Sequence, residues 1–308
     1  MRNKKIVVVG IFVTDLSFYS KKIPSKGETI IGNKYTIGPG GKGSNQVIAC
    51  LRSGGEVYFI AQIGDDEFGS KGLKLHQSEG TYTEGIIIKK GGSTGAATIS
   101  IDEKGMNSIV VVPGVAKDLS PKMIQEKKSI IRKSSILLTG FEVPLETAKQ
   151  SLILSKESNL KTILNPAPYI KTNDEIWPLV DYLTPNEHEA TSITGIKVKD
   201  PITAFEAGRK LCKMGVQNAI ITLGSLGAVY VSNQEDTGKH FPPPYLSEKV
   251  IDTVGAGDVF NGAFSTALAE NAPISEAIEF ANKAAAISVR KSGAALSSPK
   301  REDINKIL

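Results

Sequence analysis

The sequence predicts an α/β protein with a doubly wound, mostly parallel sheet, helices on both faces of that sheet, and a small antiparallel β lid. Short apolar runs rich in β-branched residues recur along the chain, with helix-length amphipathic segments between most of them. In two other regions, short strands follow one another with turn residues and no helix between them. Strands that alternate with helices are typical of parallel sheets, whereas helix-free runs favour antiparallel pairing.

Six apolar runs are expected to form the buried strands of the main sheet. They are KIVVVG, VYFIAQIG, SSILLTG, KTILNPAP, DYLTPNE and NAIITLGS, which begin at residues 5, 57, 134, 161, 181 and 218. The basic, apolar start of the chain is like a signal peptide, but Asp15 interrupts it and no small-residue cleavage site follows. A first strand is therefore expected there, and ligands are expected at the carboxyl ends of the strands.

The two helix-free regions, 16–37 and 85–112, are expected to form the lid. A solitary exposed sheet needs a cover, which here is either the site beneath it or a second copy of the chain. We found no internal repeat and no linker, so we expect one domain spanning residues 1–308 that carries the lid. A homodimer formed through the lid is also expected.

Composition excludes several classes of protein. With 308 residues, 40% hydrophobic and 22% charged, the chain has ordinary globular usage, and no apolar run approaches the roughly 20 residues that cross a bilayer. A cytoplasmic protein without a membrane partner is expected. The net charge of +5 is spread over scattered lysines, which favours a small anionic ligand over nucleic acid. The two cysteines and three histidines have no metal-site or disulfide spacing.

The segment GPGGKGSNQ, residues 38–46, formally matches the dinucleotide fingerprint, with Asp65 further along the chain. That fingerprint should follow the first parallel strand, whereas these glycines follow a strand of the expected lid. The segment is not a Walker A loop either, because Gly43 stands after Lys42 where serine or threonine is required. What it offers is a backbone that can approach a ligand, one lysine, and Asn45 at a helix start.

The segment DTVGAGDVFNGAF places Gly255, Ala256 and Gly257 directly before the acid Asp258 and an apolar, helix-like stretch. Small residues at a helix start allow a ligand to come close to the free backbone amides. Asp258 can then accept a proton from that ligand, or it can simply cap a helix that begins at Val259. The segment alone leaves both interpretations open.

Together, GPGGKGSNQ, QIGDDEFG and DTVGAGDVFNGAF resemble the paired signatures of the ribokinase family of carbohydrate kinases, the phosphofructokinase-B type. LNPAP, TPNEHEA and ITLGSLG lie between them in the family's order, so the resemblance spans nearly the whole chain. It implies a ribokinase-like fold and transfer of the ATP γ-phosphoryl group to a sugar hydroxyl, with Mg²⁺ on the nucleotide and K⁺ as an activator. Within the family, the combination points to kinases that phosphorylate D-ribose at O5.

The resemblance also implies roles for individual residues. Asp258 would accept the proton of the attacking hydroxyl, and the turn of Gly255, Ala256 and Gly257 would form the anion hole. The residues implied around the sugar are Asp15, Gly41, Lys42, Gly43, Asn45, Glu142 and Asp258. The residues implied around the nucleotide are Asn186, Thr222, Gly224, Ser225, Gly227, Gly257 and Asn282.

Cation sites follow from the same resemblance. Glu189, three residues after Asn186, would hold magnesium through water, although a plain helix-surface role is the alternative. The monovalent cation would be bound mainly by main-chain carbonyls, with one hydroxyl nearby. The residues implied for it are Asp252, Val254, Ser288, Lys291, Gly293 and Ser297.

Two positions depart from the commonest pattern. Val13 stands where most ribokinases carry an asparagine that bonds sugar hydroxyls, and Asn282 replaces a histidine often found beside the adenine. The loss at Val13 keeps open a kinase for deoxyribose, or for another small furanose or nucleoside. From other classes, a dinucleotide-dependent dehydrogenase and a catalytically silent sugar-binding regulator are the alternatives. The first gives Asp258 no role, and the second would not be expected to retain it with the full anion-hole turn.

Overall fold

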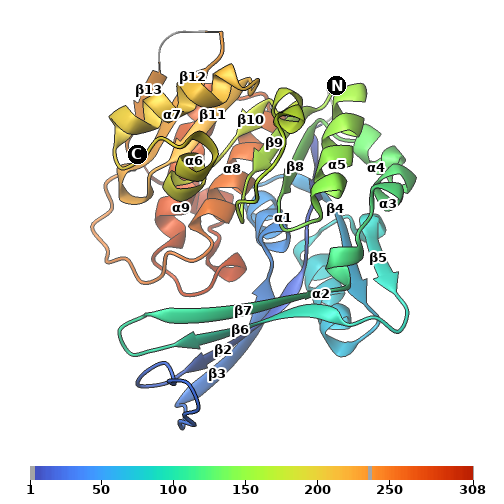
Figure 1. Ribbon diagram of the computed structural model, residues 1–308, viewed down its shortest axis with the longest axis vertical. Helices are drawn as coiled ribbons and strands as arrows, with labels where there is room; N and C mark the ends of the chain where they lie inside the picture. Colours follow the sequence, from blue (N-terminus) through green and yellow to red (C-terminus); the bar gives the residue numbers. More distant parts are fainter. Residues whose placement is uncertain (1–3, 235–237, 308) are drawn as a thin grey trace.

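The computed structural model describes residues 4–234 and 238–307, so the first residues of the basic start, Met1–Asn3, lie outside the described residues. Within them, the main sheet has nine strands in the order β13-β12-β11-β10-β9-β8-β1-β4-β5 (Figure 1). Its strands are β1 Lys5–Val9, β4 Glu56–Gly64, β5 Ile86–Lys89, β8 Ile136–Gly140, β9 Lys161–Asn165, β10 Tyr182–Leu183, β11 Asn218–Thr222, β12 Ala228–Ser232 and β13 Gly238–Phe241. All six predicted runs are strands of this sheet.

The sheet is parallel from β5 to β11, and β12 and β13 then pair antiparallel at its edge. The expected lid boundary at residue 85 is wrong, because Ile86–Lys89 pairs parallel with β4 as strand β5. Helix α2 (Glu67–Glu79) crosses between these two strands, so the segment completes one more strand–helix–strand unit. The second of the two lid segments therefore begins only after β5.

Helices cover both faces of the main sheet and create two separate cores. On one face, α1 (Lys42–Arg52), α8 (Ala256–Ala269), α9 (Ile274–Ser288) and α10 (Arg301–Asn305) contribute buried residues to one apolar cluster. On the other face, the second cluster contains residues of α3 (Pro121–Glu126), α4 (Lys128–Arg132), α5 (Leu145–Glu157), α6 (Glu187–Thr194) and α7 (Pro201–Lys213). Strand β1 feeds both clusters, because Ile6 and Val8 face one and Val7 and Val9 the other. The prediction of a doubly covered sheet is confirmed.

The lid is a four-stranded sheet in the order β3-β2-β6-β7, lying to one side of the main body (Figure 1). Its strands are β2 Val13–Tyr19, β3 Lys34–Gly40, β6 Thr94–Ile101 and β7 Asn107–Gly114. The two outer pairs are antiparallel as expected, whereas β2 and β6 run parallel. Strand β2 follows β1, and β6 follows β5. Both therefore leave the carboxyl edge of the main sheet in the same direction, which explains why they pair parallel.

The lid strands connect closely to the elements of the main body. Strand β2 begins four residues after β1 ends at Val9, and β3 ends two residues before α1 begins at Lys42. The glycine-rich segment therefore follows a lid strand and not the first parallel strand, which excludes its reading as a dinucleotide fingerprint. None of the described helices is both long and apolar enough to span a bilayer.

Candidate active site

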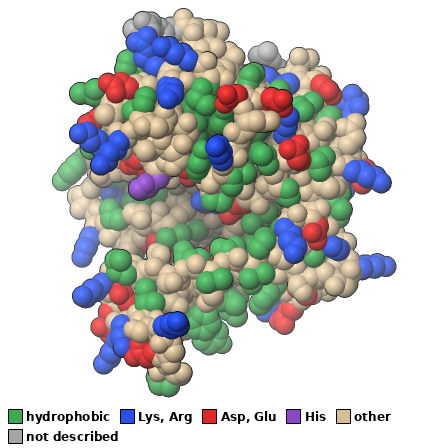
Figure 2. Space-filling model, in the orientation of Figure 1, with side chains coloured by type: hydrophobic (Ala, Val, Ile, Leu, Met, Phe, Trp, Pro, Cys, Tyr) green, Lys and Arg blue, Asp and Glu red, His purple; other side chains and the backbone are tan. Residues whose placement is uncertain are grey.

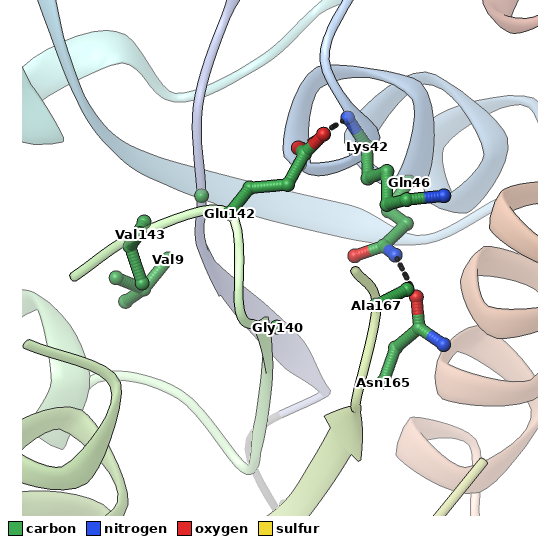
Figure 3. Close-up of a pocket in the computed structure, with 10 residues that line it drawn as sticks. Val9, Lys42, Gln46, Gly140, Glu142, Val143, Asn165 and Ala167 are labelled. Atoms are coloured by element: carbon green, nitrogen blue, oxygen red, sulfur yellow. Dashed lines mark hydrogen bonds between the residues drawn. The ribbon is translucent and has the colours of Figure 1, made fainter. Parts of the chain in front are cut away.

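Glu142 and the start of α1 meet at the carboxyl edge of the sheet. Gly41 is the N-cap of α1 with φ 86°, and the Glu142 Oε2 atom accepts a hydrogen bond from the backbone N–H of Lys42 at 2.6 Å (Figure 3). Burial raises the pKa of Glu142 to about 7; the charge of Asp258 acts in the same direction, and that of Lys42 opposes it. The start of α1 therefore binds the carboxyl group of Glu142, a predicted sugar-side residue, next to the predicted Lys42.

Asp258 lies inside α8 and not at its cap. The helix begins at Ala256 after the N-cap Gly255, so the interpretation of Asp258 as a cap is wrong. The side chain is 4% exposed, and its two oxygens accept from Asn45 Nδ2 at 2.9 Å and Gln46 Nε2 at 3.1 Å. Both donors come from α1, so a neighbouring helix fixes the carboxyl group.

One lysine faces three carboxyl groups, of which Asp258 and Glu189 are buried and Glu142 is half-buried. Charge interactions with Asp258, and then with Glu142 and Glu189, raise the pKa of Lys42. Burial raises the pKa of Asp258, while Lys42, Asn45 and Gln46 act against that shift. An acid that is buried yet stabilised in its ionised form by a cation and two amides is suited to accept a proton.

The turn before Asp258 requires glycine at its first position. Gly255 has φ 80°, and a Cβ built there would lie 2.7 Å from the Cα of Ala294. No side chain caps the helix start, and the first-turn amides of a helix have no intrahelical partner. A Cβ at Gly257 would meet nothing within 4 Å, so this turn opens to the pocket described next. Free amides at a helix start suit an anion such as a phosphoryl group.

A pocket of about 310 Å³ extends from this turn along the carboxyl ends of β9, β10 and β11. The space-filling view is hollowed between the main body and the lid (Figure 2). The pocket is lined by Lys42, Asp258, the turn of Gly255–Gly257 and most of the nucleotide-side residues implied by the sequence. These last are Asn186, Thr222, Gly224, Gly227, Gly257 and Asn282. Ser225 is exposed in the same turn as Gly224 and is not among the lining residues.

Asn186 and Glu189 form a capping box at the start of α6. The Asn186 side chain accepts from the Glu189 N–H at 2.9 Å, and Glu189 Oε2 accepts from the Asn186 N–H at 2.9 Å. Glu189 is 8% exposed and lines the pocket, so the helix-surface alternative is wrong. Asn282 donates to the carbonyl oxygen of Phe241 at 3.1 Å, which fixes its side chain at the far wall of the pocket.

On the sugar side, the residues come from both the lid and the main body. Asp15 lies on β2, and a Cβ on Gly40 would come within 2.0 Å of its Oδ1 atom, so this carboxyl group covers the end of β3. Burial raises the pKa of Asp15 to about 6. Asn45 uses its nitrogen on Asp258, and its buried Oδ1 has no hydrogen-bond partner within the described part of the chain. That oxygen is an acceptor available to a hydroxyl donor.

Beneath Lys42 lies a small cavity of about 10 Å³, which is about the size of one water molecule. Its polar walls are Lys42, Gln46, Glu142 and Asn165, and Figure 3 shows Gln46 pointing toward Asn165. Gly43, predicted near the sugar, also lines this cavity. The cavity adjoins the larger pocket through Lys42 and Asn165, which line both.

The segments predicted to bind a monovalent cation lie against each other. Asp252 donates its backbone N–H to the Val289 carbonyl oxygen at 3.1 Å, and its carboxylate accepts from Val254 N and Gly293 N at 3.0 Å each. The Ser288 carbonyl oxygen accepts from Lys291 N at 3.1 Å, and the Ser297 hydroxyl donates to the Ala294 carbonyl oxygen at 2.8 Å. The predicted residues are therefore neighbours beside the Gly255 turn.

Four buried polar residues behind Asp258 have no role predicted from the sequence: Gln46, Asn165, Thr184 and Asn261. Asn165 ends strand β9, where ligands are expected, and Gln46 closes the glycine-rich segment, so a signal existed for these two. Thr184 and Asn261 bond to each other across 77 residues of sequence, and no local pattern predicts that contact.

Comparisons with known proteins agree with this geometry. The model of the pfkB family carbohydrate kinases matches residues 3–301. The ribokinase of Haemophilus influenzae is 37% identical over 99% of this chain and 98% of its own, and the deoxyribokinase of Salmonella typhimurium is 31% identical over 98% of each. The structure of Arabidopsis thaliana ribokinase complexed with ribose and ATP superposes with a TM-score of 0.91 at 28% identity, covering 99% of this chain and 98% of that one.

The family match covers nearly the whole chain, and full-length relatives exceed 30% identity. The dehydrogenase alternative has no support in the fold, because no glycine fingerprint follows β1. This chain belongs to the pfkB family of carbohydrate kinases.

Proposed function

We propose that the protein transfers the γ-phosphoryl group of ATP to the O5 hydroxyl of D-ribose, giving D-ribose 5-phosphate and ADP. The sugar oxygen attacks the γ-phosphorus, the bond from that phosphorus to the β,γ-bridging oxygen breaks, and the hydroxyl proton passes to Asp258. The electron pair of the broken bond leaves with ADP. Phosphoryl transfer requires alignment and charge neutralisation more than covalent catalysis.

The observation that carries this proposal is the position of Asp258 between a free helix start and the sugar-side residues. Amides of the Gly255–Gly257 turn are suited to the transferring phosphoryl oxygens, and Lys42 supplies the positive charge. Carboxyls of Asp15 and Glu142 can accept from sugar hydroxyls, and the unpartnered oxygen of Asn45 can do the same. These side chains bind and orient the sugar, and the lid excludes water above it.

Magnesium would enter with the nucleotide. The pocket wall near the phosphates offers the oxygens of Asn186, Glu187 and Glu189, which are hard donors of the type that magnesium accepts. Across the described residues, no group of three or more potential ligands of the His, Cys, Asp or Glu type is gathered at one point. The donors thus fit an ion held through water and phosphate oxygens, which when bound would neutralise charge on the nucleotide.

A monovalent cation is proposed beside the anion hole, at Asp252, Val254, Ser288, Lys291, Gly293 and Ser297. The contacts between the two loop segments support it, because Asp252 bonds to both Val289 and Gly293 and Ala294 lies against Gly255, so the two segments meet beside that turn. When bound, such an ion would add positive charge near the phosphates and stiffen the turn before Asp258.

We expect saturable activation of turnover by potassium, larger than that by sodium. Activity is measured at saturating Mg-ATP and ribose while potassium replaces tetramethylammonium at constant ionic strength. Ser297→Ala should raise the potassium concentration required for half-activation, because it removes the side-chain oxygen of the set. A flat response of the parent enzyme to potassium would remove the site.

The second candidate substrate is 2-deoxyribose, and Val13 is the observation that favours it. Val13 lies on the same face of β2 as Asp15, two residues away, and its side chain is 2% exposed against Gly95. A valine offers no hydrogen bond to a sugar hydroxyl. An enzyme without such a partner rejects the deoxy sugar only weakly.

Val13→Asn is therefore expected to raise the ratio of kcat/KM for ribose over 2-deoxyribose by about fivefold, since one hydrogen bond contributes about 1 kcal/mol. Val13→Thr is a second test, because it keeps the β-branched shape and adds a hydroxyl that can also bond to the sugar. Kinetics with both sugars provide the measurement. A ratio that stays constant in both variants would show that residue 13 does not face the 2-position.

A homodimer through the lid is proposed from the edge strand β7. Its residues Ile109, Val110, Val111 and Val112 are 48–61% exposed, and an exposed apolar edge is a site of association. Light scattering should give about twice the chain mass of 32.8 kDa for the parent. Val110→Lys with Val112→Lys should give monomers, whereas Ile202→Lys on α7 should not. A monomeric parent would contradict the proposal.

The decisive test of the function is a phosphorylation screen of pentoses and nucleosides with ATP. Formation of a 5-phosphate from ribose at the highest kcat/KM supports the proposal. Preference for 2-deoxyribose selects the second candidate, and the absence of any phosphorylated sugar would overturn both.

A further inference from the structure

Helices α1 and α8 approach each other closely behind the active site. A Cβ at Gly262 would lie 2.5 Å from the Ala49 Cβ and 2.8 Å from the Gln46 carbonyl oxygen, so only glycine allows this contact. Asp258 stands one helical turn before Gly262 and faces the same way. The side chain of Gln46 is thereby brought against the catalytic carboxyl group.

Gln46 uses both hydrogens of its side-chain amide. Nε2 donates to Asp258 Oδ1 at 3.1 Å and to Asn165 Oδ1 at 3.3 Å, and the residue is 2% exposed. Because both acceptors are oxygens, the reversed amide would place oxygen against oxygen. The orientation of Gln46 is therefore fixed, and so is the Asp258 oxygen that it holds.

The hydrogen bonds continue from Asn165 back to α8. Asn165 Nδ2 donates to the Thr184 carbonyl oxygen at 3.1 Å, Thr184 Oγ1 donates to Asn261 Oδ1 at 2.7 Å, and Asn261 Nδ2 donates to the Gly257 carbonyl oxygen at 2.8 Å. Gly257 is the residue before Asp258, so the bonds close a ring. Asn165, Thr184 and Asn261 are 7%, 2% and 1% exposed, so the ring is buried.

We propose that Gln46 is a positioning residue for the base Asp258, and that the ring through Asn165, Thr184 and Asn261 holds the base and the anion-hole turn in one arrangement. This inference rests on the proposed kinase function. A carboxyl group held on one oxygen alone can rotate, and a misplacement of about 1 Å can cost about 100-fold in rate. Fixing carboxyl and turn together keeps the proton acceptor aligned with the site of the phosphoryl group.

The first test is Gln46→Glu, which keeps the size of the side chain and places a second carboxyl against Asp258. The other charged groups facing Asp258 are Lys42 of α1, Glu142 after β8 and Glu189 of α6. Adding a negative charge and removing a donor both raise the pKa of Asp258, so the acid limb of kcat/KM should move to higher pH. We expect kcat at neutral pH to fall at least about tenfold, with KM for ATP within a few-fold.

Gln217→Glu is the matched control. It makes the same chemical change at a residue whose Oε1 accepts from Asn233 Nδ2 at 2.8 Å, at an exposed contact away from the pocket. Its kcat and pH profile should equal those of the parent. A shift in both variants alike would assign the effect to net charge and overturn the inference.

The second test is Gln46→Met, which removes both donors without adding charge and remains informative if the acidic variant does not fold. It should lower kcat with a smaller change in the pH profile. Thr184→Val breaks the ring on its far side, because it removes the hydrogen bond to Asn261. The double variant should lose kcat by a smaller factor than the product of the factors lost by the two single variants. Independent effects would instead multiply, and multiplication would contradict the ring as a unit.

The outcomes separate this inference from the proposed function. A parent that phosphorylates no sugar overturns both. An active parent whose Gln46 variants keep its kcat and pH profile overturns the positioning role alone. Loss of kcat with a shifted acid limb, while the Gln217 control stays normal, supports both.

Discussion

Asp258→Asn should lower kcat for sugar phosphorylation by about 10²- to 10⁴-fold, because the variant cannot accept the proton of the attacking hydroxyl. In the parent, kcat/KM should fall as Asp258 becomes protonated, at a pH above the ordinary aspartate range because burial raises its pKa. The base must be ionised to act, so activity is present above that pKa and lost below it. The variant should lack this acid limb, and steady-state rates from pH 4 to 9 provide the measurement.

The asparagine side chain would meet two amide donors, Asn45 and Gln46, with only one oxygen. That loss is offset because a buried charge is removed, so the thermal midpoint should stay near that of the parent. Asp303→Asn, at an exposed aspartate near the C-terminus, is the control with unchanged activity. Turnover of Asp258→Asn within a few-fold of the parent would remove Asp258 from the mechanism, and a collapse in stability would make its role structural.

Lys42→Met should lower kcat/KM by about 10²- to 10³-fold, the usual cost of losing one group that stabilises developing charge. Its ammonium group faces Asp258, Glu142 and Glu189, and removal leaves these three acids without their common cation. Lys42 opposes the upward pKa shifts of Asp258 and Glu142, so the acid limb of the variant should move to higher pH. Both quantities come from one pH series of initial rates.

Lys71→Met is the matched control, because Lys71 forms an exposed pair with Glu67 on α2. Exposed pairs contribute little, so its kinetics should match those of the parent. If Lys42→Met kept the parent's kcat/KM, the transferring group would be neutralised by other residues. If Lys42→Met changed only the KM for the sugar, Lys42 would bind ground-state substrate without acting in the transition state.

The sequence predicts the main sheet well, because six of its strands are continuous apolar runs. It misses β13, since Gly238–Phe241 has two polar residues and an antiparallel edge strand needs no continuous apolar pattern. It also misses β12, an apolar run that follows β11 with no α-helix between them, so the alternation of strands and helices does not mark it. It assigns Ile86–Lys89 to the lid because the residues of a short strand do not indicate whether that strand pairs with the main sheet or with the lid. The partner, β4, decides that question.

The site is predictable where chemistry follows a motif. Lys42, Glu142 and Asp258, named from the sequence, lie together around one charge cluster. Asn45 shows where a motif stops being informative. The sequence predicts it on the sugar side, and the structure adds a hydrogen bond from its amide to Asp258. The role of Gln46 depends on contacts with Asn165 and Asp258, more than 100 residues away, and no local pattern encodes such pairs.

The capping box of α6 has a consequence for how substitutions at Glu189 are tolerated. The Glu189 Oε2 atom accepts a hydrogen bond from the Asn186 N–H at the start of α6, and the same side chain lines the larger pocket, so one carboxylate serves both the helix and the pocket wall. Glu189→Gln retains an oxygen to accept from the Asn186 N–H and loses only the charge, whereas Glu189→Ala loses both. We therefore expect Glu189→Ala to be less stable than Glu189→Gln, so that a loss of activity in Glu189→Ala can arise from the helix as well as from the pocket.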